Sequence, residues 1–288
     1  MPRRLAATAY EKVWGSPDTE PWCRNPEQRN IGEVWFAASD SVPLLVKILF
    51  TRDNLSVQVH PDDEYAGEHH DGSRGKTEMW HILRAEPDAK IALGVRETVT
   101  AGQLRDAALS GAIMDLLDWI PVRPGDTYFI PAGTIHAIGG GITLCEVQQL
   151  SDITYRLFDY GRPRPLHVAK ALEAIRLETA AGKVAPVELP DRTVLMDSVY
   201  FRIEKIDVDG TRSGDSMRGA DEQTGLTYLF AAEGSGQIRA SASADFELVD
   251  LPGRTMAAIP ASSPVWEIED RGGLELIRIT PRWPKATA

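Results

Sequence analysis

GDTYFIPAGTIH, residues 125–136, has the spacing G-x5-P-x-G-x2-H, and the expected architecture starts from this segment. Gly125 permits a tight turn into a strand, and Pro131 with Gly133 shapes a second turn that presents His136 inward. The segment therefore predicts an antiparallel strand whose end delivers an imidazole to the interior.

Two further blocks supply polar side chains from segments that we expect to be strands. They are QVHPDD, residues 58–63, and KTEMW, residues 76–80. Because side chains two apart on a strand share a face, Gln58 and His60 point the same way. By the same rule the side chains of Lys76 and Glu78 lie on the same face of their strand.

These side chains form a candidate metal site. If neighbouring strands bring Glu78 and His136 to the face of Gln58 and His60, an amide oxygen, two imidazoles and a carboxylate converge on one divalent cation. Imidazole and carboxylate ligands suit Zn²⁺, and a retained open position would make the site catalytic. Two histidines and one carboxylate could also hold Fe(II) in an oxygenase.

The composition limits the class of partner. The chain has 288 residues, of which 43% are hydrophobic and 25% charged, with a formal net charge of −11. Nucleic-acid and anionic-membrane binders rely on basic surfaces, so neither partner is expected. Two cysteines are too few for a disulfide framework. No apolar run follows the basic first residues, so no signal peptide is expected. No segment is long and apolar enough to span a bilayer as a helix. A cytoplasmic protein is expected.

Short apolar runs punctuated by Pro and Gly predict many strands. In the first half they fall within 31–60 and at Met79 to Leu83, Lys90 to Gly94, Asp126 to Pro131 and Ile142 to Gln148. In the second half they fall at Tyr200 to Val208, Leu226 to Ala231, Phe246 to Leu251, Ala257 to Pro260, Val265 to Ile268 and Leu274 to Ile279.

Two helical stretches interrupt the strands. Thr100 and Gln103 have the form of a capping box, and Leu104, Ala108 and Leu109 are expected to form the apolar stripe of the helix that follows. A second short helix is expected through Ile113, Leu116 and Leu117 up to Pro121, so that the insertion covers about 99–119. Apolar residues at Val168, Ala171, Leu172 and Ile175 predict an amphipathic helix over about 167–179.

The junction between two domains is expected just after this linking helix. The division gives a domain of residues 1–182 and a second of residues 183–288. Pro252-Gly253 followed by Ile259-Pro260-Ala261 echoes the turn residues of the 125–136 segment, which suggests a degenerate repeat. Since the sequence contains no histidine after His167, the second domain cannot repeat the metal site.

The four blocks together resemble a known family. The spacing in 125–136 is similar to the second motif of the cupins, and the run 58–66, the run 76–80, the run 131–138 and the run 146–162 resemble type I phosphomannose isomerase of the short bacterial kind. The resemblance covers most of residues 10–165. It implies an all-β fold of two cupin-type (jelly-roll) barrels, the first metal-binding and the second metal-free.

The resemblance also implies an activity and a set of site residues. The activity is a zinc-dependent isomerisation of mannose 6-phosphate to fructose 6-phosphate, with one zinc per chain, a small-molecule sugar phosphate as partner, and a monomer or weak homo-oligomer. The implied metal ligands are Gln58, His60, Glu78 and His136. The implied catalytic residues are Lys76, Glu146, Asp152 and Arg156, and Lys76, Arg156 and Arg162 are expected to bind the substrate.

Several points stay open at the level of sequence. The proton-transferring base is Glu146, Asp152 or, if neighbouring cations depress its pKa, Lys76. The alternative functions are a non-catalytic sugar-phosphate-binding cupin and an iron or manganese cupin oxygenase.

Overall fold

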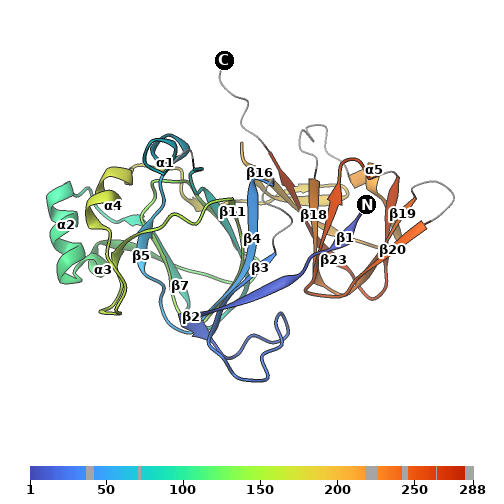
Figure 1. Ribbon diagram of the computed structural model, residues 1–288, viewed down its shortest axis with the longest axis horizontal. Coiled ribbons are helices and arrows are strands. Elements are labelled where there is room, and N and C mark those ends of the chain that lie inside the picture. Colours follow the sequence, from blue (N-terminus) through green and yellow to red (C-terminus); the bar gives the residue numbers. More distant parts are fainter. Residues whose placement is uncertain (37–41, 71–72, 218–225, 242–245, 264, 283–288) are drawn as a thin grey trace, which may run out of the picture. The chain divides into compact units, whose positions relative to one another are not determined.

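The computed structural model describes residues 1–36, 42–70, 73–217, 226–241, 246–263 and 265–282. It divides into two compact units, one of Ala9–Trp35 with Leu44–Val184 and one of Met1–Thr8, Phe36–Pro43 and Ala185–Ala288. Each unit is built from two antiparallel sheets (Figure 1), which confirms the all-β cupin-type class predicted from the sequence. None of the described helices is long and apolar enough to cross a membrane.

The N-terminal unit carries the predicted site. Its larger sheet has the order β13-β9-β6-β11-β4-β2-β3, and its smaller sheet has the order β12-β5-β10-β7-β8. The bounds of the larger sheet are β2 (Ala7–Ser16), β3 (Ile31–Phe36), β4 (Leu44–Thr51), β6 (Glu78–Ala85), β9 (Thr127–Ile130), β11 (Ile142–Gln149) and β13 (Gly182–Lys183). Those of the smaller sheet are β5 (Val57–Val59), β7 (Lys90–Val95), β8 (Leu117–Pro121), β10 (His136–Ile138) and β12 (Tyr155–Phe158).

The alternation of side chains in the smaller sheet separates two cores. One face packs against the helices, with Val57, Val59 and Ala137 among its buried residues. The opposite face shares a core with the larger sheet, to which Ile138 contributes. Because Gln58 lies between the two valines that face the helices, its side chain points to the interior between the sheets.

Four helices lie in this unit: α1 (Asp63–His69), α2 (Ala101–Ser110), α3 (Ile113–Leu116) and α4 (Val168–Ala174). Helices α2, α3 and α4 lie together at one side of the unit, next to the smaller sheet (Figure 1). The capping box between Thr100 and Gln103 is confirmed, with both reciprocal contacts present.

The predicted insertion needs two corrections. Leu109 is not part of the apolar stripe, since it is 65% exposed and Ala107 is buried in its place. The second helix is a single turn that ends at Leu116, and Leu117–Pro121 forms β8 instead. Pairing of β8 with β7 provides these residues with backbone partners that a longer helix would have supplied internally.

The turn between β9 and β10 depends on a glycine. Gly133 has a φ of +85°, a left-handed conformation that glycine adopts without strain. A Cβ at this position would also lie 2.7 Å from Cγ of Arg176. The backbone N–H of Gly133 donates to the carbonyl oxygen of His60 at 2.8 Å. This bond connects the turn that leads to His136 with the other histidine of the predicted site.

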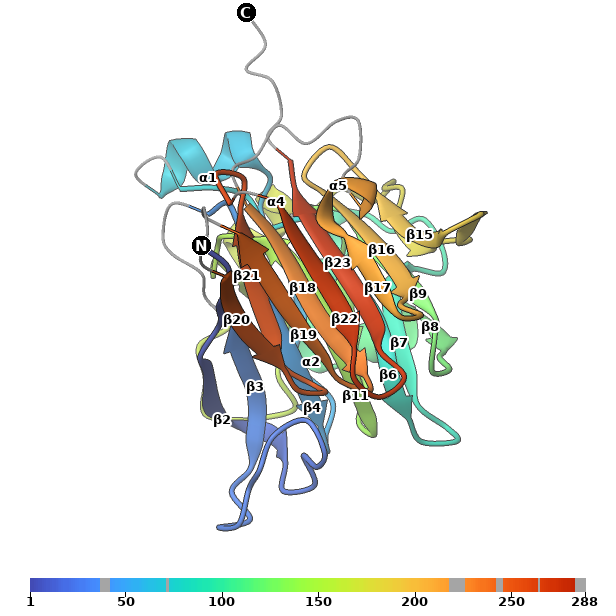
Figure 2. The ribbon, with the colours of Figure 1, turned by 90° about the vertical axis from the view of Figure 1, so that its right-hand side faces the viewer.

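The C-terminal unit is a second pair of sheets. Their orders are β1-β21-β18-β23-β16-β15-β14 and β17-β22-β19-β20, and the strands lie side by side in Figure 2. In the first sheet the bounds are β1 (Arg3–Arg4), β14 (Val187–Leu189), β15 (Arg192–Asp197), β16 (Phe201–Asp207), β18 (Leu226–Glu233), β21 (Met256–Pro260) and β23 (Glu275–Pro281). In the second they are β17 (Thr211–Ser213), β19 (Gly236–Ser241), β20 (Phe246–Leu251) and β22 (Trp266–Asp270). The short helix α5 (Gly214–Met217) directly follows β17.

The sequence-based division after residue 182 assigned the N-terminus to the first domain. In the structure β1 pairs with β21, so the first residues complete a sheet of the C-terminal unit. A two-residue strand carries no hydrophobic pattern of its own, which is why its partner was not readable from sequence.

Candidate active site

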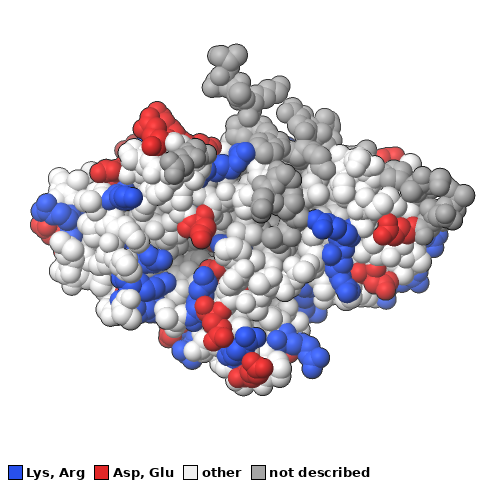
Figure 3. Space-filling view, in the orientation of Figure 1, with Lys and Arg blue, Asp and Glu red and all other residues white. Residues whose placement is uncertain are grey.

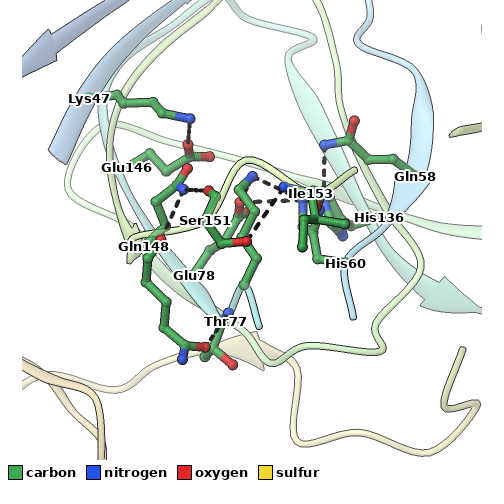
Figure 4. Close-up of polar contacts among 12 residues, drawn as sticks. Lys47, Gln58, His60, Thr77, Glu78, His136, Glu146, Gln148, Ser151 and Ile153 are labelled. Atoms are coloured by element: carbon green, nitrogen blue, oxygen red, sulfur yellow. Dashed lines mark hydrogen bonds and ion pairs between the residues drawn. The ribbon is translucent and has the colours of Figure 1, made fainter. Parts of the chain in front are cut away.

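Three side chains of the N-terminal unit converge as a candidate metal-binding cluster. One ligand atom from each of His60, Glu78 and His136 lies within 4.8 Å of the others, and all three residues are buried. Since β10 pairs with β5 and β6 belongs to the opposite sheet, the cluster bridges the interior of the barrel. Figure 4 shows the side chains around this centre.

Both histidines are held in the orientation that metal binding requires. Nδ1 of His60 lies 2.8 Å from the carbonyl oxygen of Ile153, and Nδ1 of His136 lies 2.9 Å from that of Thr134. A carbonyl only accepts, so each Nδ1 carries the proton and each Nε2 has a free lone pair. Burial lowers the pKa of His136 to about 4, and burial together with Lys76 lowers the pKa of His60, so both rings are neutral at pH 7.

Gln58 stands beside this cluster but presents its amide nitrogen. Its Nε2 lies 3.2 Å from Nε2 of His136, and its Oε1 accepts a hydrogen bond from Oγ of Ser56 at 3.0 Å. Rotation of the carboxamide by half a turn would exchange the two atoms, and the Ser56 hydroxyl can accept as well as donate. Two imidazole nitrogens, one carboxylate oxygen and a turnable amide therefore form a donor set that fits a zinc ion.

Lys76 places an ammonium group against the same donors. Its Nζ lies 2.5 Å from Oε1 of Glu78 and 3.2 Å from Nε2 of His60. Burial opposes the charge, but Glu78 and Glu146 outweigh that effect, and the pKa of Lys76 is raised. The lysine is therefore a cation, whereas action as a base would need the opposite shift.

A second buried ion pair lies on the larger sheet. Nζ of Lys47 is 3.2 Å from Oε1 of Glu146, directly across from it in the pairing of β4 with β11. The indole N–H of Trp80 donates to both Glu146 at 3.1 Å and Glu78 at 3.2 Å. Trp80 thus joins Glu78 of the candidate metal-binding cluster to the Lys47–Glu146 pair. Figure 4 shows the contact between Lys47 and Glu146.

Two side-chain hydrogen bonds hold the backbone of the loop between β11 and β12. The amide nitrogen of Gln148 donates to the carbonyl oxygen of Ser151 at 2.5 Å, and His60 donates to that of Ile153. Between these two points lies Asp152, which is exposed toward the pocket. One of the cluster histidines therefore also fixes the segment that carries this carboxylate.

These groups line one pocket with a volume of about 200 Å³. Of the predicted residues, the pocket wall includes Gln58, Lys76, Glu146, Asp152 and Arg156. His60, Glu78 and His136 are not among the lining residues, but they contact Lys76 and Gln58, which are. Residues that the sequence analysis did not assign also line it, namely Lys12, Trp14, Glu33, Trp35, Lys47, Leu49, Leu55, Ser56, Ile138, Thr154 and Arg164.

Arg162, expected at the sugar phosphate, does not line the pocket. Its Nη1 donates to the carbonyl oxygen of Asn54 at 2.9 Å and contacts Asp159 at 3.3 Å. Arg164 lines the pocket instead, next to Arg156. A tight turn accounts for this difference, because Tyr160 and Gly161 both have positive φ and the N–H of Arg162 bonds the carbonyl of Asp159.

The surface around the site has no single sign of charge. Figure 3 shows Lys and Arg interspersed with Asp and Glu on the face in view, and an acidic group over α1. Asp63 and Glu64 lie in the first turn of that helix. Attraction of an anion therefore depends on the cations inside the pocket rather than on the surrounding surface.

Fold and site together define a cupin-type barrel with an interior metal-binding cluster beside a cation-lined pocket. Residues 4–99 match the family model described as phosphomannose isomerase type I, catalytic domain. The chain is 38% identical over 230 residues to the probable mannose-6-phosphate isomerase GmuF of Bacillus subtilis. This alignment covers 73% of this chain and 70% of that protein. The chain belongs to the type I phosphomannose isomerase family.

Another relative agrees with this assignment, and two solved structures share the fold. Mannose-6-phosphate isomerase ManA of Bacillus subtilis is 38% identical over 209 residues, and the alignment spans 69% of this chain and 64% of that protein's length. The crystal structure of mannose 6-phosphate isomerase from Bacillus subtilis has a TM-score of 0.81 at 28% identity and covers 96% of this chain and 99% of that one. A zinc-bound mannose 6-phosphate isomerase shares the fold at 17% identity, with a TM-score of 0.75 over 98% of this chain and 100% of that one.

Proposed function

We propose that this protein is an aldose–ketose isomerase that interconverts mannose 6-phosphate and fructose 6-phosphate. The observation that carries the proposal is the convergence of His60, Glu78 and His136 beneath a pocket lined by lysine and arginine. The family relatives are named for this activity. A small-molecule sugar phosphate is the proposed partner of a cytoplasmic monomer or weak homo-oligomer.

We propose one zinc ion per chain, held by His60, Glu78, His136 and the amide oxygen of Gln58. The donor chemistry supports zinc, and one structural neighbour is a zinc-bound isomerase. When bound, zinc would supply Lewis-acid stabilisation of negative charge on substrate oxygens. Both Nδ1–H groups, bonded to backbone carbonyls, hold the imidazoles ready without further rearrangement.

The isomerisation moves a proton from C2 of the aldose to C1 while a hydrogen passes from the C2 oxygen to the C1 oxygen. The ammonium of Lys76 is placed to donate hydrogen bonds to these oxygens, because its raised pKa keeps it charged. Arg156, always protonated, adds a planar donor on the pocket wall. The ammonium of Lys76 would favour the enediolate over the neutral sugar, and Arg156 would hold the substrate in the pocket.

Three carboxylates line the pocket, namely Glu33, Glu146 and Asp152. Glu33 is paired with Lys12, and the other two are the candidates for proton transfer at carbon. Both oxygens of Glu146 are engaged, one by Lys47 and the other by Trp80. Asp152 has no ion pair or side-chain hydrogen bond with any described residue. We therefore propose that Asp152 transfers the proton. Glu146 would instead hold the side chains of Lys47 and Trp80 in place.

A coupled assay on protein of measured metal content tests the proposal. Chelation should abolish conversion of mannose 6-phosphate to fructose 6-phosphate, and one equivalent of zinc per chain should restore it. Full activity in metal-free protein would refute the role of the metal. Binding of mannose 6-phosphate without conversion, in zinc-loaded protein, would instead support a non-catalytic binding module.

A further inference from the structure

The charges along the pocket are not evenly compensated. Each lysine of the pocket wall has its own carboxylate within ion-pair distance. These pairs are Lys12 with Glu33 at 3.2 Å, Lys47 with Glu146 at 3.2 Å, and Lys76 with Glu78 at 2.5 Å. A charge that is already paired contributes little net field to an incoming anion.

The arginines of the same pocket differ from the lysines. Arg156 and Arg164 both line the wall. Asp159 forms an ion pair with Arg164, and its charge acts to raise the pKa of Arg156. Asp159 also contacts Arg162, so among the described residues one carboxylate serves three guanidinium groups. Three guanidinium groups against the carboxylates of Asp159 and of Asp152 on the pocket wall leave a net positive charge, which favours an anion.

Asp159 fixes the orientation of Arg164. Its two oxygens accept from Nε and Nη2 of Arg164, each at 2.6 Å, in a bidentate pair. The Asp159 side chain is only 2% exposed, whereas that of Arg164 is 25% exposed, so the buried carboxylate holds an arginine that reaches solvent. The pairing leaves Nη1 of Arg164 available on the other side of the guanidinium.

Arg156 lacks such a partner. No hydrogen bond or ion pair joins its guanidinium to any of the described residues, although its backbone is held by His167, which accepts from the Arg156 N–H at 3.2 Å. Burial and the neighbouring Arg164 lower the pKa of Arg156, because positive charge is disfavoured there. An anion between the two arginines would relieve this repulsion.

We propose that Arg164 binds the phosphate group of the substrate together with Arg156, and that Asp159 is the positioning residue that holds Arg164 in place. This inference rests on the proposed function. The phosphate would lie between Arg156 and Arg164, and the sugar carbons would point toward Lys76 and the candidate metal-binding cluster. Arg162, behind Asp159 and bonded to the Asn54 carbonyl, supports the turn without touching the ligand.

Calorimetric titration of zinc-loaded protein with inorganic phosphate tests the assignment directly, without isomerisation. Arg164→Met should weaken phosphate binding about 10- to 100-fold, as expected for loss of a charge-assisted hydrogen bond. Arg105→Met removes the same charge from the exposed surface of α2, where Arg105 contacts Asp106, and should change the affinity less than twofold. Unchanged phosphate affinity in Arg164→Met would overturn the proposal. Equal losses in Arg162→Met and Arg164→Met would also overturn it, since general electrostatics rather than contact would then be responsible.

Asp159→Asn separates positioning from net charge. The substitution adds one positive charge to the pocket, so a purely electrostatic effect would strengthen phosphate binding. If Asp159 positions Arg164, phosphate binding weakens despite the added charge, and KM for mannose 6-phosphate rises more than kcat falls. If Arg164→Met does not fold, as judged by thermal unfolding, Arg164→Lys retains the charge but not the bidentate geometry and should weaken phosphate binding in the same direction.

The outcomes for this inference and for the proposed function are distinct. Wild-type protein that binds phosphate through Arg164 but converts no sugar would leave the anion site standing and remove the isomerase proposal. Wild-type protein that isomerises, with an Arg164→Met variant of unchanged KM and phosphate affinity, would remove only the anion site.

Discussion

His136 lies directly across from Gln58 where β10 pairs with β5, so their side chains share the interior face of the smaller sheet. On its other side Gln58 faces Arg156 of β12. One row across three strands therefore holds a proposed metal ligand at each of two positions and an arginine proposed to bind the substrate at the third. The distance between the metal cluster and this arginine is set by strand spacing rather than by flexible loops.

Replacement of a cluster histidine should remove the metal and the activity together. His136→Ala deletes one of two neutral imidazole donors, and we expect less than a tenth of the wild-type zinc content after dialysis, measured by inductively coupled plasma mass spectrometry. His81→Asn is the matched control, because His81 is also buried on the larger sheet but contacts Thr127 instead of the cluster. Full zinc content in His136→Ala would show that the cluster is not the metal site.

Arg156→Met should keep zinc and lose turnover. We propose that its guanidinium binds the substrate's phosphate group and so positions the reacting carbons, and kcat/KM should therefore fall by about 100-fold or more. The zinc content and the thermal unfolding temperature should match those of the wild type, because the guanidinium has no ion pair with the described residues to lose. Wild-type turnover in this variant would exclude a catalytic role for Arg156.

Replacing only one partner of the buried Lys47–Glu146 ion pair should lower the free energy of unfolding. Lys47→Met leaves the Glu146 carboxylate buried without its cation, and we expect the free energy of unfolding to fall by about 3–5 kcal/mol. Urea unfolding of metal-free protein measures this change. The double variant Lys47→Met with Glu146→Gln should recover part of the loss, and equal stability of the single and double variants would contradict the ion pair.

Cys145 should resist alkylation in the folded protein. It is 1% exposed, and burial with the nearby Glu146 raises the pKa of its thiol to about 12, so no thiolate forms at pH 8. Iodoacetamide should modify only the partly exposed Cys23 under native conditions and both thiols in urea. Mass spectrometry of the digested protein distinguishes these sites, and rapid labelling of Cys145 without denaturant would contradict its burial.

Local patterns were enough to predict that several residues of the candidate metal-binding cluster lie together. The two-residue period places Gln58 and His60 on one segment, and the glycine–proline spacing before His136 predicts the turn that delivers it. The capping box at Thr100 likewise identified the start of α2. Each of these signals depends on residues close together in sequence.

Long-range pairing was not predictable in the same way. Lys47 sits in a strand whose eight residues are all buried, and such a lysine signals a buried partner. The sequence does not say that the partner is Glu146, because that depends on the register of β4 with β11, some hundred residues apart. The exchange of Arg162 for Arg164 at the pocket wall has a comparable cause, since it follows from the dihedral angles of the turn at Tyr160 and Gly161.

The distribution of histidine has a practical consequence for spectroscopy. All six imidazoles belong to the sequence from His60 to His167, within the N-terminal unit. Nitrogen-15 labelling of histidine would therefore report on that unit alone, free of overlap from the other half of the chain. The ring protons of His60 and His136, locked to carbonyl oxygens, should exchange slowly with water and give separate resonances, which would serve as an internal gauge of metal occupancy.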